Sequence, residues 1–265
     1  MKLACAGWGF REMPLEVYFK VAADLEVHYV EVNCQAGVPP HVQEDMKEDQ
    51  VGAVKRSADA CGVEIVALAP GSDFTLEDPG DLEREVLRVK RIIDLGERLE
   101  SSVIRLFAGW IGEEKITEAT YRQVAECFDE VGEYAGDKGI VLALENHGGV
   151  TANIERTRRI MESISSDAVG LNYDPANFAH SGEDPVEAVR ALKDYIVYVH
   201  LKDYLSEEAE ETFCALGEGR IEWEPIFSEL SDFYQGYFAI EYERPDDVVE
   251  GTRKSAAFVK ALLRG

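Results

Sequence analysis

Short apolar runs alternate along the whole chain with longer segments in which apolar residues recur every three or four positions. The short runs predict buried strands, and the longer segments predict amphipathic helices. The predicted strands cover residues 3–5, 29–33, 64–69, 103–107, 140–145, 169–173, 196–201 and 237–242. The predicted helices cover residues 14–25, 41–61, 81–99, 117–138, 153–164, 223–230 and 246–263, and a shorter helix begins near residue 185.

This regular alternation predicts the fold class. Strands that alternate with helices form a parallel sheet, and eight such units in about 250 residues are typical of a (β/α)8 TIM barrel. A doubly wound open sheet is the alternative, but the first strand is not followed by the GxGxxG turn of dinucleotide-binding sheets. We therefore expect an α/β protein with one TIM barrel domain that spans residues 1–265.

Four of the predicted strands end on polar residues. The fifth strand is an apolar run that ends on Glu145, shortly before two glycines, and later strands end at Asp174, His200 and Glu241. In a TIM barrel the carboxyl ends of the strands meet at one mouth, where active sites lie. The four side chains should therefore converge there if they point into the barrel.

The alternation of side chains along each strand supports this orientation. Successive residues of a strand point to opposite faces, so residues two positions apart share a face. On the seventh strand, His200 shares its face with Tyr198 and Ile196, whereas Val197 and Val199 face the helices. The helix-facing positions of the other three strands are also bulky and apolar, so the polar residue of each strand is expected inside the barrel.

Three carboxylates and one imidazole at one place need a compensating charge. Without it the carboxylates would repel one another, and protonating them would take large pKa shifts. A divalent cation removes this conflict. Three oxygen donors and one nitrogen suit Mn²⁺ first, with Mg²⁺, Co²⁺ or Zn²⁺ as alternatives. A single such residue could equally be half of an ion pair or a solvated strand end, so the prediction rests on four strands that end alike.

The composition narrows the class of partner and the compartment. The net charge of −25, from 27 basic and 52 acidic residues, disfavours nucleic acid, because its phosphate backbone would be repelled. No apolar run reaches the about 18 residues of a membrane span, and the first residues do not resemble a signal peptide. Five scattered cysteines form no CxxC pair, which favours a reduced, cytoplasmic setting. Solubility explains the acidic surface, and adaptation to high salt is the alternative.

Five short motifs surround the polar strand ends. They are Leu-Glu-Asn-His-Gly-Gly at 144–149, Asp-Pro-Ala-Asn at 174–177, His-Leu-Lys-Asp at 200–203, Gly-Glu-Gly at 217–219 followed by Trp223, and Ile-Glu-Tyr at 240–242. In content and order they resemble the xylose isomerase-like TIM barrels, a superfamily of sugar and sugar-phosphate isomerases and epimerases. The resemblance covers the whole chain and is specific to the superfamily, not to one substrate. It implies that the metal ligands are Glu145, Asp174, His200 and Glu241.

The resemblance also implies a reaction. In epimerases of this superfamily, two ligand carboxylates on opposite faces of a hydroxy-ketone transfer its proton through a metal-stabilised enediolate. Glu145 and Glu241 would be this acid/base pair, while Asp174 and His200 would mainly hold the metal. The implied function is isomerisation or epimerisation of a small sugar, sugar phosphate or polyol ketone in carbohydrate metabolism.

Further side chains could contact such a substrate. Lys202 shares a face with the metal-binding imidazole and could neutralise developing negative charge or a substrate phosphate, or it could be a surface lysine paired with Asp203. Glu31 and Arg105 could reach the interior or be halves of internal ion pairs. Trp8 and Trp110 follow strand ends and could stack on a sugar or pack within their loops. The predicted substrate-binding residues are His147, Asn177, Lys202, Trp8, Glu31 and Arg105.

The chain departs from the ketohexose epimerases of the superfamily at Thr151, Asn177 and Ser206, where those enzymes carry glutamate, histidine and arginine. Dehydratases of cyclic polyol ketones and hydroxypyruvate-type isomerases share the scaffold and stay open, as does a non-catalytic sugar-binding barrel. Apurinic endonucleases use three zinc ions and bind DNA, which five histidines and a charge of −25 disfavour. The expected partner is a small carbohydrate, with no nucleic acid or membrane, and assembly into a homo-oligomer stays open.

Overall fold

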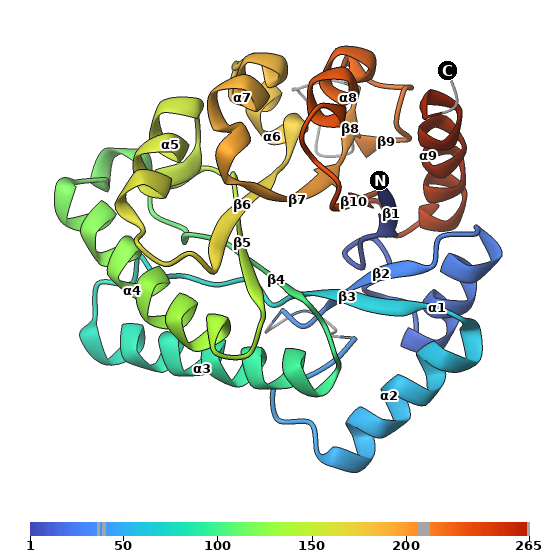
Figure 1. Ribbon diagram of the computed structural model, residues 1–265, viewed down its shortest axis with the longest axis horizontal. Helices are drawn as coiled ribbons and strands as arrows, with labels where there is room; N and C mark the ends of the chain where they lie inside the picture. The colour runs from blue at the N-terminus through green and yellow to red at the C-terminus, as the bar shows by residue number, and fades with distance from the viewer. Residues whose placement is uncertain (36–37, 39–40, 206–212, 264–265) are drawn as a thin grey trace.

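Eight parallel strands close into a barrel at the centre of the protein (Figure 1). The computed structural model describes residues 1–35, 38, 41–205 and 213–263. The barrel strands are β1 (Lys2–Cys5), β2 (Tyr29–Asn33), β3 (Glu64–Ala69), β4 (Val103–Leu106), β5 (Val141–Glu145), β6 (Val169–Tyr173), β7 (Ile196–Leu201) and β10 (Tyr237–Ile240). They follow one another around the barrel in this order, and β10 pairs with β1 to close it. The prediction of a TIM barrel is confirmed.

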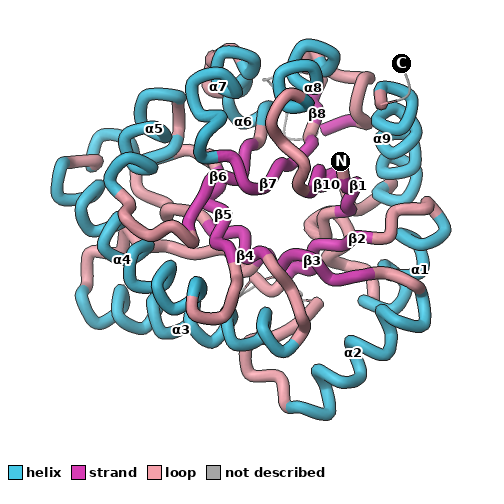
Figure 2. Tube along the Cα trace, viewed as in Figure 1, coloured by secondary structure: helices cyan, strands magenta, loops and turns pink. Residues whose placement is uncertain are grey.

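The helices form a ring outside the strands (Figure 2). Several begin where a side chain accepts a free N–H group of the first turn, as Asp78 does for Asp81 and Asn153 does for Arg156. None of the described helices is long and apolar enough to cross a membrane. The helices are α1 (Leu15–Asp24), α2 (Glu48–Cys61), α3 (Pro79–Arg98), α4 (Glu118–Gly136), α5 (Ile154–Ser163), α6 (Pro175–His180), α7 (Pro185–Leu192), α8 (Trp223–Ser231) and α9 (Val248–Leu262), with 3-10 turns η1 (Glu113–Lys115), η2 (Gly149–Thr151) and η3 (Lys193–Tyr195).

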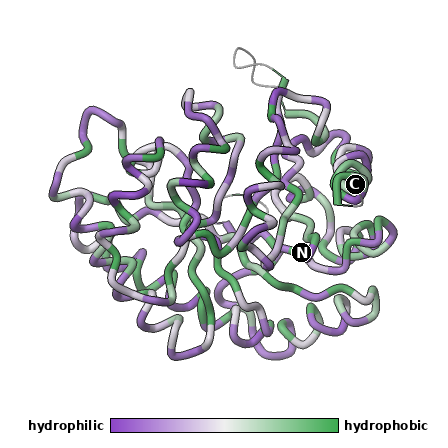
Figure 3. The backbone as a smooth tube through the Cα atoms, turned by 45° about the horizontal axis from the view of Figure 1, so that its top comes forward, coloured by the Kyte–Doolittle hydropathy of each residue, from purple (hydrophilic) through white to green (hydrophobic). Residues whose placement is uncertain are grey.

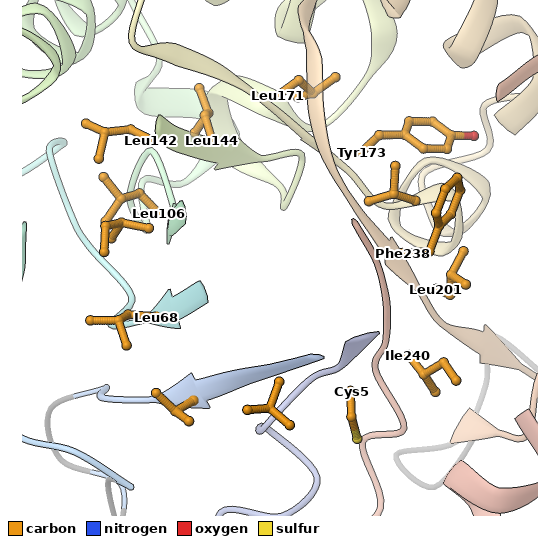
Figure 4. Packing of buried hydrophobic residues seen from close by; sticks show 14 of the residues in the cluster. Cys5, Leu68, Leu106, Leu142, Leu144, Leu171, Tyr173, Leu201, Phe238 and Ile240 are labelled. Atoms are coloured by element: carbon orange, nitrogen blue, oxygen red, sulfur yellow. The ribbon is translucent and has the colours of Figure 1, made fainter. Parts of the chain in front are cut away.

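The barrel strands separate two apolar layers. Between strands and helices, large side chains such as Leu142, Leu171 and Phe238 form the main core (Figure 4). Inside the barrel many of the apolar side chains are small, as at Ala67 and Ala143. Figure 3 shows hydrophobic residues along the central strands and many hydrophilic residues on the surrounding helices. The small interior residues leave space for the longer polar side chains near the mouth.

An extra residue in β7 changes the predicted alternation at the start of that strand. Leu171 of β6 pairs with Ile196, but the next residue, Asn172, pairs with Tyr198, so Val197 is passed over. Ile196 therefore packs among the helix-facing side chains, and Val197 packs against the interior cluster. The predicted placement of Ile196 inside the barrel is wrong, because this bulge shifts the alternation by one residue. Tyr198 lies in the interior as predicted.

The second helix begins later than predicted. It starts at Glu48, whereas the sequence pattern predicts a helix from residue 41. The backbone N–H groups of His41 and Val42 both donate to the carbonyl of Asn33 at the end of β2. The ring of His41 also lies 3.0 Å from the carbonyl of Phe10. These long-range contacts hold the segment against the barrel, and the helix forms only after it.

The sequence pattern does not predict two small elements near the barrel mouth. The first is α6, which begins directly after β6 because the carboxylate of Asp174 accepts the N–H groups of Ala176 and Asn177. The second is an antiparallel pair outside the barrel, formed by β8 (Asp203–Tyr204) and β9 (Phe213–Cys214). Ser206, one of the departures from the ketohexose epimerases, lies outside the described residues.

Candidate metal centre

The polar ends of four strands meet at the mouth of the barrel. Glu145 is the last residue of β5, His200 lies near the end of β7, and Asp174 and Glu241 directly follow β6 and β10. One ligand atom from each residue lies within 4.8 Å of the others, and all four residues are buried. The structure therefore brings together the four residues that the sequence predicts as metal ligands.

One carboxylate oxygen of Asp174 accepts hydrogen bonds from backbone N–H groups, and the other faces the four-residue cluster. Oδ1 accepts hydrogen bonds from the N–H groups of Ala176 (2.8 Å) and Asn177 (3.2 Å). The Asn146 side chain bonds to both the N–H and the carbonyl of Asp174, which fixes the orientation of the residue. Among the described residues Oδ2 makes no hydrogen bond, and it lies 3.0 Å from Lys202 Nζ. Asp174 thus presents one carboxylate oxygen to the site.

The imidazole of His200 is held by Glu31. His200 Nε2 lies 3.0 Å from Glu31 Oε2, and Nδ1 lies 3.3 Å from Glu241 Oε2. Burial alone would lower the pKa of His200, but the carboxylates of Glu241 and Glu31 raise it well above its usual value. When His200 is neutral with its proton on Nε2 toward Glu31, Nδ1 offers a lone pair to the cluster.

Three neighbouring side chains hold Glu145. Arg105 Nε lies 3.2 Å from its Oε2, and the amide groups of Asn172 and Asn177 donate to Oε2 (3.3 Å) and Oε1 (3.1 Å). Arg105 is buried, and its guanidinium carbon lies 4.2 Å from the centre of the Phe107 ring. Arg105 is therefore half of an internal ion pair, which is one of its two expected roles, and it also lines the cavity described below.

Lys202 is enclosed by carboxylates. Its Nζ lies 2.9 Å from Glu243 Oε1, 3.0 Å from Asp174 Oδ2 and 3.4 Å from Glu241 Oε2. The interpretation as a surface lysine is wrong, because the side chain is only 4% exposed. Burial alone would raise the pKa of Glu241, but His200 and Lys202 hold that pKa well below its usual value. Glu241 is therefore ionised at neutral pH.

Asp203, the partner considered for Lys202, organises the loop that follows β7. Its carboxylate accepts hydrogen bonds of 2.9 to 3.2 Å from three backbone N–H groups and from Nε1 of Trp223. A Cβ atom on Gly219 would collide with Asp203 Oδ1, so glycine is needed at this close approach. The Gly-Glu-Gly motif and Trp223 therefore fold around one buried carboxylate.

A cavity of about 250 Å³ lies beside the cluster. In this cavity the ring of His147 lies 4.9 Å from that of Phe107 and 5.4 Å from that of Trp110, between ring centres. Burial, together with Lys202 and Arg105, lowers the pKa of His147 to about 4, so this imidazole is neutral near pH 7. The residues that line the cavity are Trp8, Gln35, Arg105, Phe107, Trp110, Glu145, His147, Lys202, Glu241 and Glu243.

Four of the six predicted substrate-binding residues line this cavity, and the other two, Glu31 and Asn177, bond to members of the cluster.

Thr151, where the ketohexose epimerases carry a glutamate, forms hydrogen bonds with the backbone at the end of β5. Its hydroxyl accepts the N–H of His147 at 3.0 Å and donates to the carbonyl of Glu145 at 3.2 Å. A larger hollow of about 490 Å³ lies at the other end of β2 and β3, away from the polar cluster.

The sequence analysis missed three residues of the cavity wall, namely Gln35, Phe107 and Glu243. Glu243 lies two positions beyond Glu241. The same spacing after His200 singles out Lys202, so the alternation of the chain could have identified Glu243 as well. Phe107 has the same spacing after Arg105 and could have been identified in the same way. Gln35 lies beyond the end of β2, where the chain leaves the regular alternation.

The donor set fits a divalent cation. Among the described residues, the buried atoms His200 Nδ1 and Asp174 Oδ2 make no hydrogen bond, although both face the other carboxylates. A cation between them would take up both lone pairs and remove the repulsion between the acids. Glu31 would then be the carboxylate that orients a metal-bound histidine, an arrangement common in metal sites. The cluster could therefore hold a divalent metal ion.

The comparisons with known proteins agree with the fold. An inosose dehydratase of Clostridium perfringens is 30% identical over 150 residues, which are 50% of this chain and 50% of that protein. An inosose dehydratase of Mesomycoplasma hyopneumoniae is 27% identical over 168 residues, 56% of each chain. The chain thus spans about half the length of the curated relatives it matches.

Solved structures share the fold at low sequence identity. The IolI protein, solved with a bound zinc atom, is 18% identical with a TM-score of 0.83, over 99% of this chain and 98% of that one. A D-psicose 3-epimerase, solved in the presence of D-fructose, is 16% identical with a TM-score of 0.81, over 100% of both chains. The family model of the xylose isomerase-like TIM barrels matches residues 19–262. Because that match covers most of the barrel, the chain belongs to the xylose isomerase-like TIM barrel family.

Proposed function

We propose that this protein is a divalent-metal-dependent isomerase or epimerase of a small sugar, sugar phosphate or polyol ketone. The observation that carries the proposal is the meeting of Glu145 and Glu241 at one cavity, with Asp174 and His200 beside them. Two carboxylates at one small cavity suit the removal of a proton next to a carbonyl group and its return. The shared fold with a D-psicose 3-epimerase supports this reading.

The four clustered residues would hold the metal. When bound, a divalent cation would supply Lewis-acid polarisation of the substrate oxygens. We take Mn²⁺ as the first cation to test because oxygen donors dominate the set, with Mg²⁺, Co²⁺ and Zn²⁺ as alternatives. The zinc atom in the IolI structure supports a divalent cation on this fold.

The protein groups around the cavity divide the proton transfer between them. Glu241 is ionised, because His200 and Lys202 lower its pKa, and so it can accept a proton. Glu145, held by Arg105, would deliver a different proton to the opposite face of the same carbon. Lys202 and Arg105 lie near both glutamates, where their charges would stabilise negative charge that develops on a substrate oxygen.

Dehydration of a cyclic polyol ketone is the second candidate, and the inosose dehydratases among the sequence relatives favour it. Its first step is the same removal of a proton next to the carbonyl. The hydroxyl group on the adjacent carbon then takes a proton and leaves as water, and a carbon–carbon double bond forms. Glu241, once it has taken the proton from carbon, would supply that proton, and the ammonium group of Lys202 lies 3.4 Å from its Oε2.

One set of measurements separates the two candidates. The Mn²⁺-loaded protein is incubated in deuterated water with ketoses, ketose phosphates and inososes. Nuclear magnetic resonance follows deuterium incorporation, and ultraviolet absorbance follows a conjugated product. Deuterium incorporation without loss of water supports an isomerase or epimerase, whereas a conjugated product supports a dehydratase.

Variants of the two glutamates test the site itself. Glu145→Gln and Glu241→Gln should each abolish exchange and lower the metal content of the purified protein. Glu113→Gln, at an exposed position in η1, serves as the control and should change neither. If both active-site variants keep their metal content and their exchange rate, the proposal is wrong.

A further inference from the structure

We propose that the cavity selects an uncharged polyhydroxy ketone over its phosphorylated counterpart, and that Glu243 enforces this choice. The inference rests on the proposed function, because it names the substrate class of the same site. Three features carry it. They are the charge of the mouth, the pairing of its basic groups and the position of Glu243.

Negative charge dominates the mouth. Among the described residues that line the cavity or form the cluster, two are permanently basic, Arg105 and Lys202, and they interact there with five carboxyl groups. Arg11 lies just outside this wall, where its guanidinium group stacks on Trp8 and donates to the carbonyls of Trp8 and Glu243. Counted as formal charges, the five carboxylates outweigh the two basic groups and a bound divalent cation together by one negative charge. A phosphate dianion would therefore be repelled. The five carboxyl groups belong to Glu31, Glu145, Asp174, Glu241 and Glu243.

Lys202 is not free to bind a phosphate. Its ammonium group lies within 3.4 Å of carboxylate oxygens from Asp174, Glu241 and Glu243. A cation bound at the cluster would draw on Asp174 and Glu241, and Glu243 would remain as the counter-ion of Lys202. The ion pair between Glu243 and Lys202 therefore withholds this positive charge from a substrate phosphate.

The other usual phosphate ligands are also engaged. Arg105 Nε lies 3.2 Å from Glu145 Oε2, and the guanidinium group stacks on Phe107. Proteins also bind phosphate at helix N-termini, but at α6 the carboxylate of Asp174 already accepts the first free N–H groups. The internal segments outside the described residues, 36–37, 39–40 and 206–212, contain no lysine or arginine in their sequence. They can supply no further cation.

Glu243 is placed to bind hydroxyl groups. Its side chain lines the cavity and is 19% exposed, compared with 5% for Glu241. A carboxylate accepts several hydrogen bonds, as a polyol offers, and the rings of Trp8 and Trp110 in the same wall present apolar faces to C–H groups. The volume of about 250 Å³ lies below the about 300 Å³ at which drug-sized sites begin, so it suits one small ring or chain.

Matched pairs of neutral and phosphorylated compounds test the inference. Deuterium exchange is compared for D-fructose and D-fructose 6-phosphate, and for D-xylulose and D-xylulose 5-phosphate. Binding is measured without turnover, by quenching of tryptophan fluorescence with myo-inositol and myo-inositol 1-phosphate, since Trp8 and Trp110 line the cavity. We expect the neutral member to be preferred at least about tenfold, because like charges brought together cost several kcal/mol.

A preference for the phosphorylated member, equal use of both, or no binding of either would overturn the inference. Absence of exchange with every ketone would instead count against the proposed function, and the binding ratio would still decide the inference. The two failures are therefore distinguishable.

Variants at Glu243 test its assigned role. Glu243→Gln keeps the shape of the side chain but removes its charge and frees Lys202, so the preference should shrink by about tenfold. Glu243→Asp keeps the charge and should keep the preference, which guards against a mere folding defect. Glu113→Gln changes the net charge equally at an exposed site and should leave the ratio unchanged. An unaltered ratio in folded Glu243→Gln would refute the role of this residue.

Discussion

Glu31 Oε2 lies 3.0 Å from His200 Nε2, although the two residues are 169 positions apart in the chain. Both side chains are completely buried. The contact joins β2 to β7 through the interior of the barrel, with β1 and β10 between the two strands in the sheet. It directs the other imidazole nitrogen toward the carboxylates of the candidate metal centre.

Replacement of Glu31 should weaken metal binding without removing any ligand. Carboxylates that orient a ligating histidine contribute about 10–100-fold to metal affinity, so Glu31→Ala should lower Mn²⁺ affinity by that factor. Glu31→Gln, which can still accept a hydrogen bond from Nε2, should show a smaller loss. Calorimetric titration measures both values. Equal, undiminished affinities would mean that Glu31 does not orient His200.

Metal binding should release a proton from His200. The pKa of this residue is raised in the metal-free protein by Glu241 and Glu31 against the effect of burial, so the imidazole is protonated at neutral pH. Because Nδ1 must lose its proton to bind a cation, the affinity should rise with pH, by up to about tenfold per unit while His200 remains protonated. Titration in buffers of different ionisation enthalpy measures the protons released. A release of none at pH 7 would contradict this expectation.

Loss of Lys202 should destabilise the metal-free protein more than the metal-loaded one. Lys202→Met leaves the buried carboxylates of Asp174 and Glu243 without their cation, and removing one partner of a buried pair costs about 3–5 kcal/mol. A bound divalent cation would neutralise part of this charge. Urea unfolding with Mn²⁺ and with a chelator measures the difference. The same loss under both conditions would argue against a cation at the cluster.

Replacement of Asp203 should unfold its loop and lower global stability. Asp203→Ala removes the carboxylate that accepts four buried or half-buried N–H donors, and each fully buried donor that finds no other acceptor costs about 1–3 kcal/mol. We expect a loss of more than about 3 kcal/mol in the free energy of unfolding. Asp167→Ala, at an exposed position, should change it by less than about 0.5 kcal/mol. Similar values for the two variants would show that Asp203 does not hold the loop.

Much of the barrel was predictable because its signals are local. The strands at 29–33, 64–69, 169–173 and 196–201 have the same bounds in the sequence prediction and in the structure, since apolar runs between turn residues mark buried strands. The start of α2 was not predictable, because the segment that contains His41 is held by hydrogen bonds to Asn33 and Phe10. The position of Ile196 was not predictable either, because the bulge in β7 depends on its register with β6.

The sequence by itself determined the eight-fold alternation and which residue stands at the polar end of each strand, because periodicity depends only on neighbours in the chain. Closure of the barrel decided which side chains face one another across its interior. Glu31 therefore meets His200, and Glu243 and Asp174 enclose Lys202. These pairings depend on register, on the bulge in β7 and on the loops after the strands, and none of them is written in the spacing of the residues.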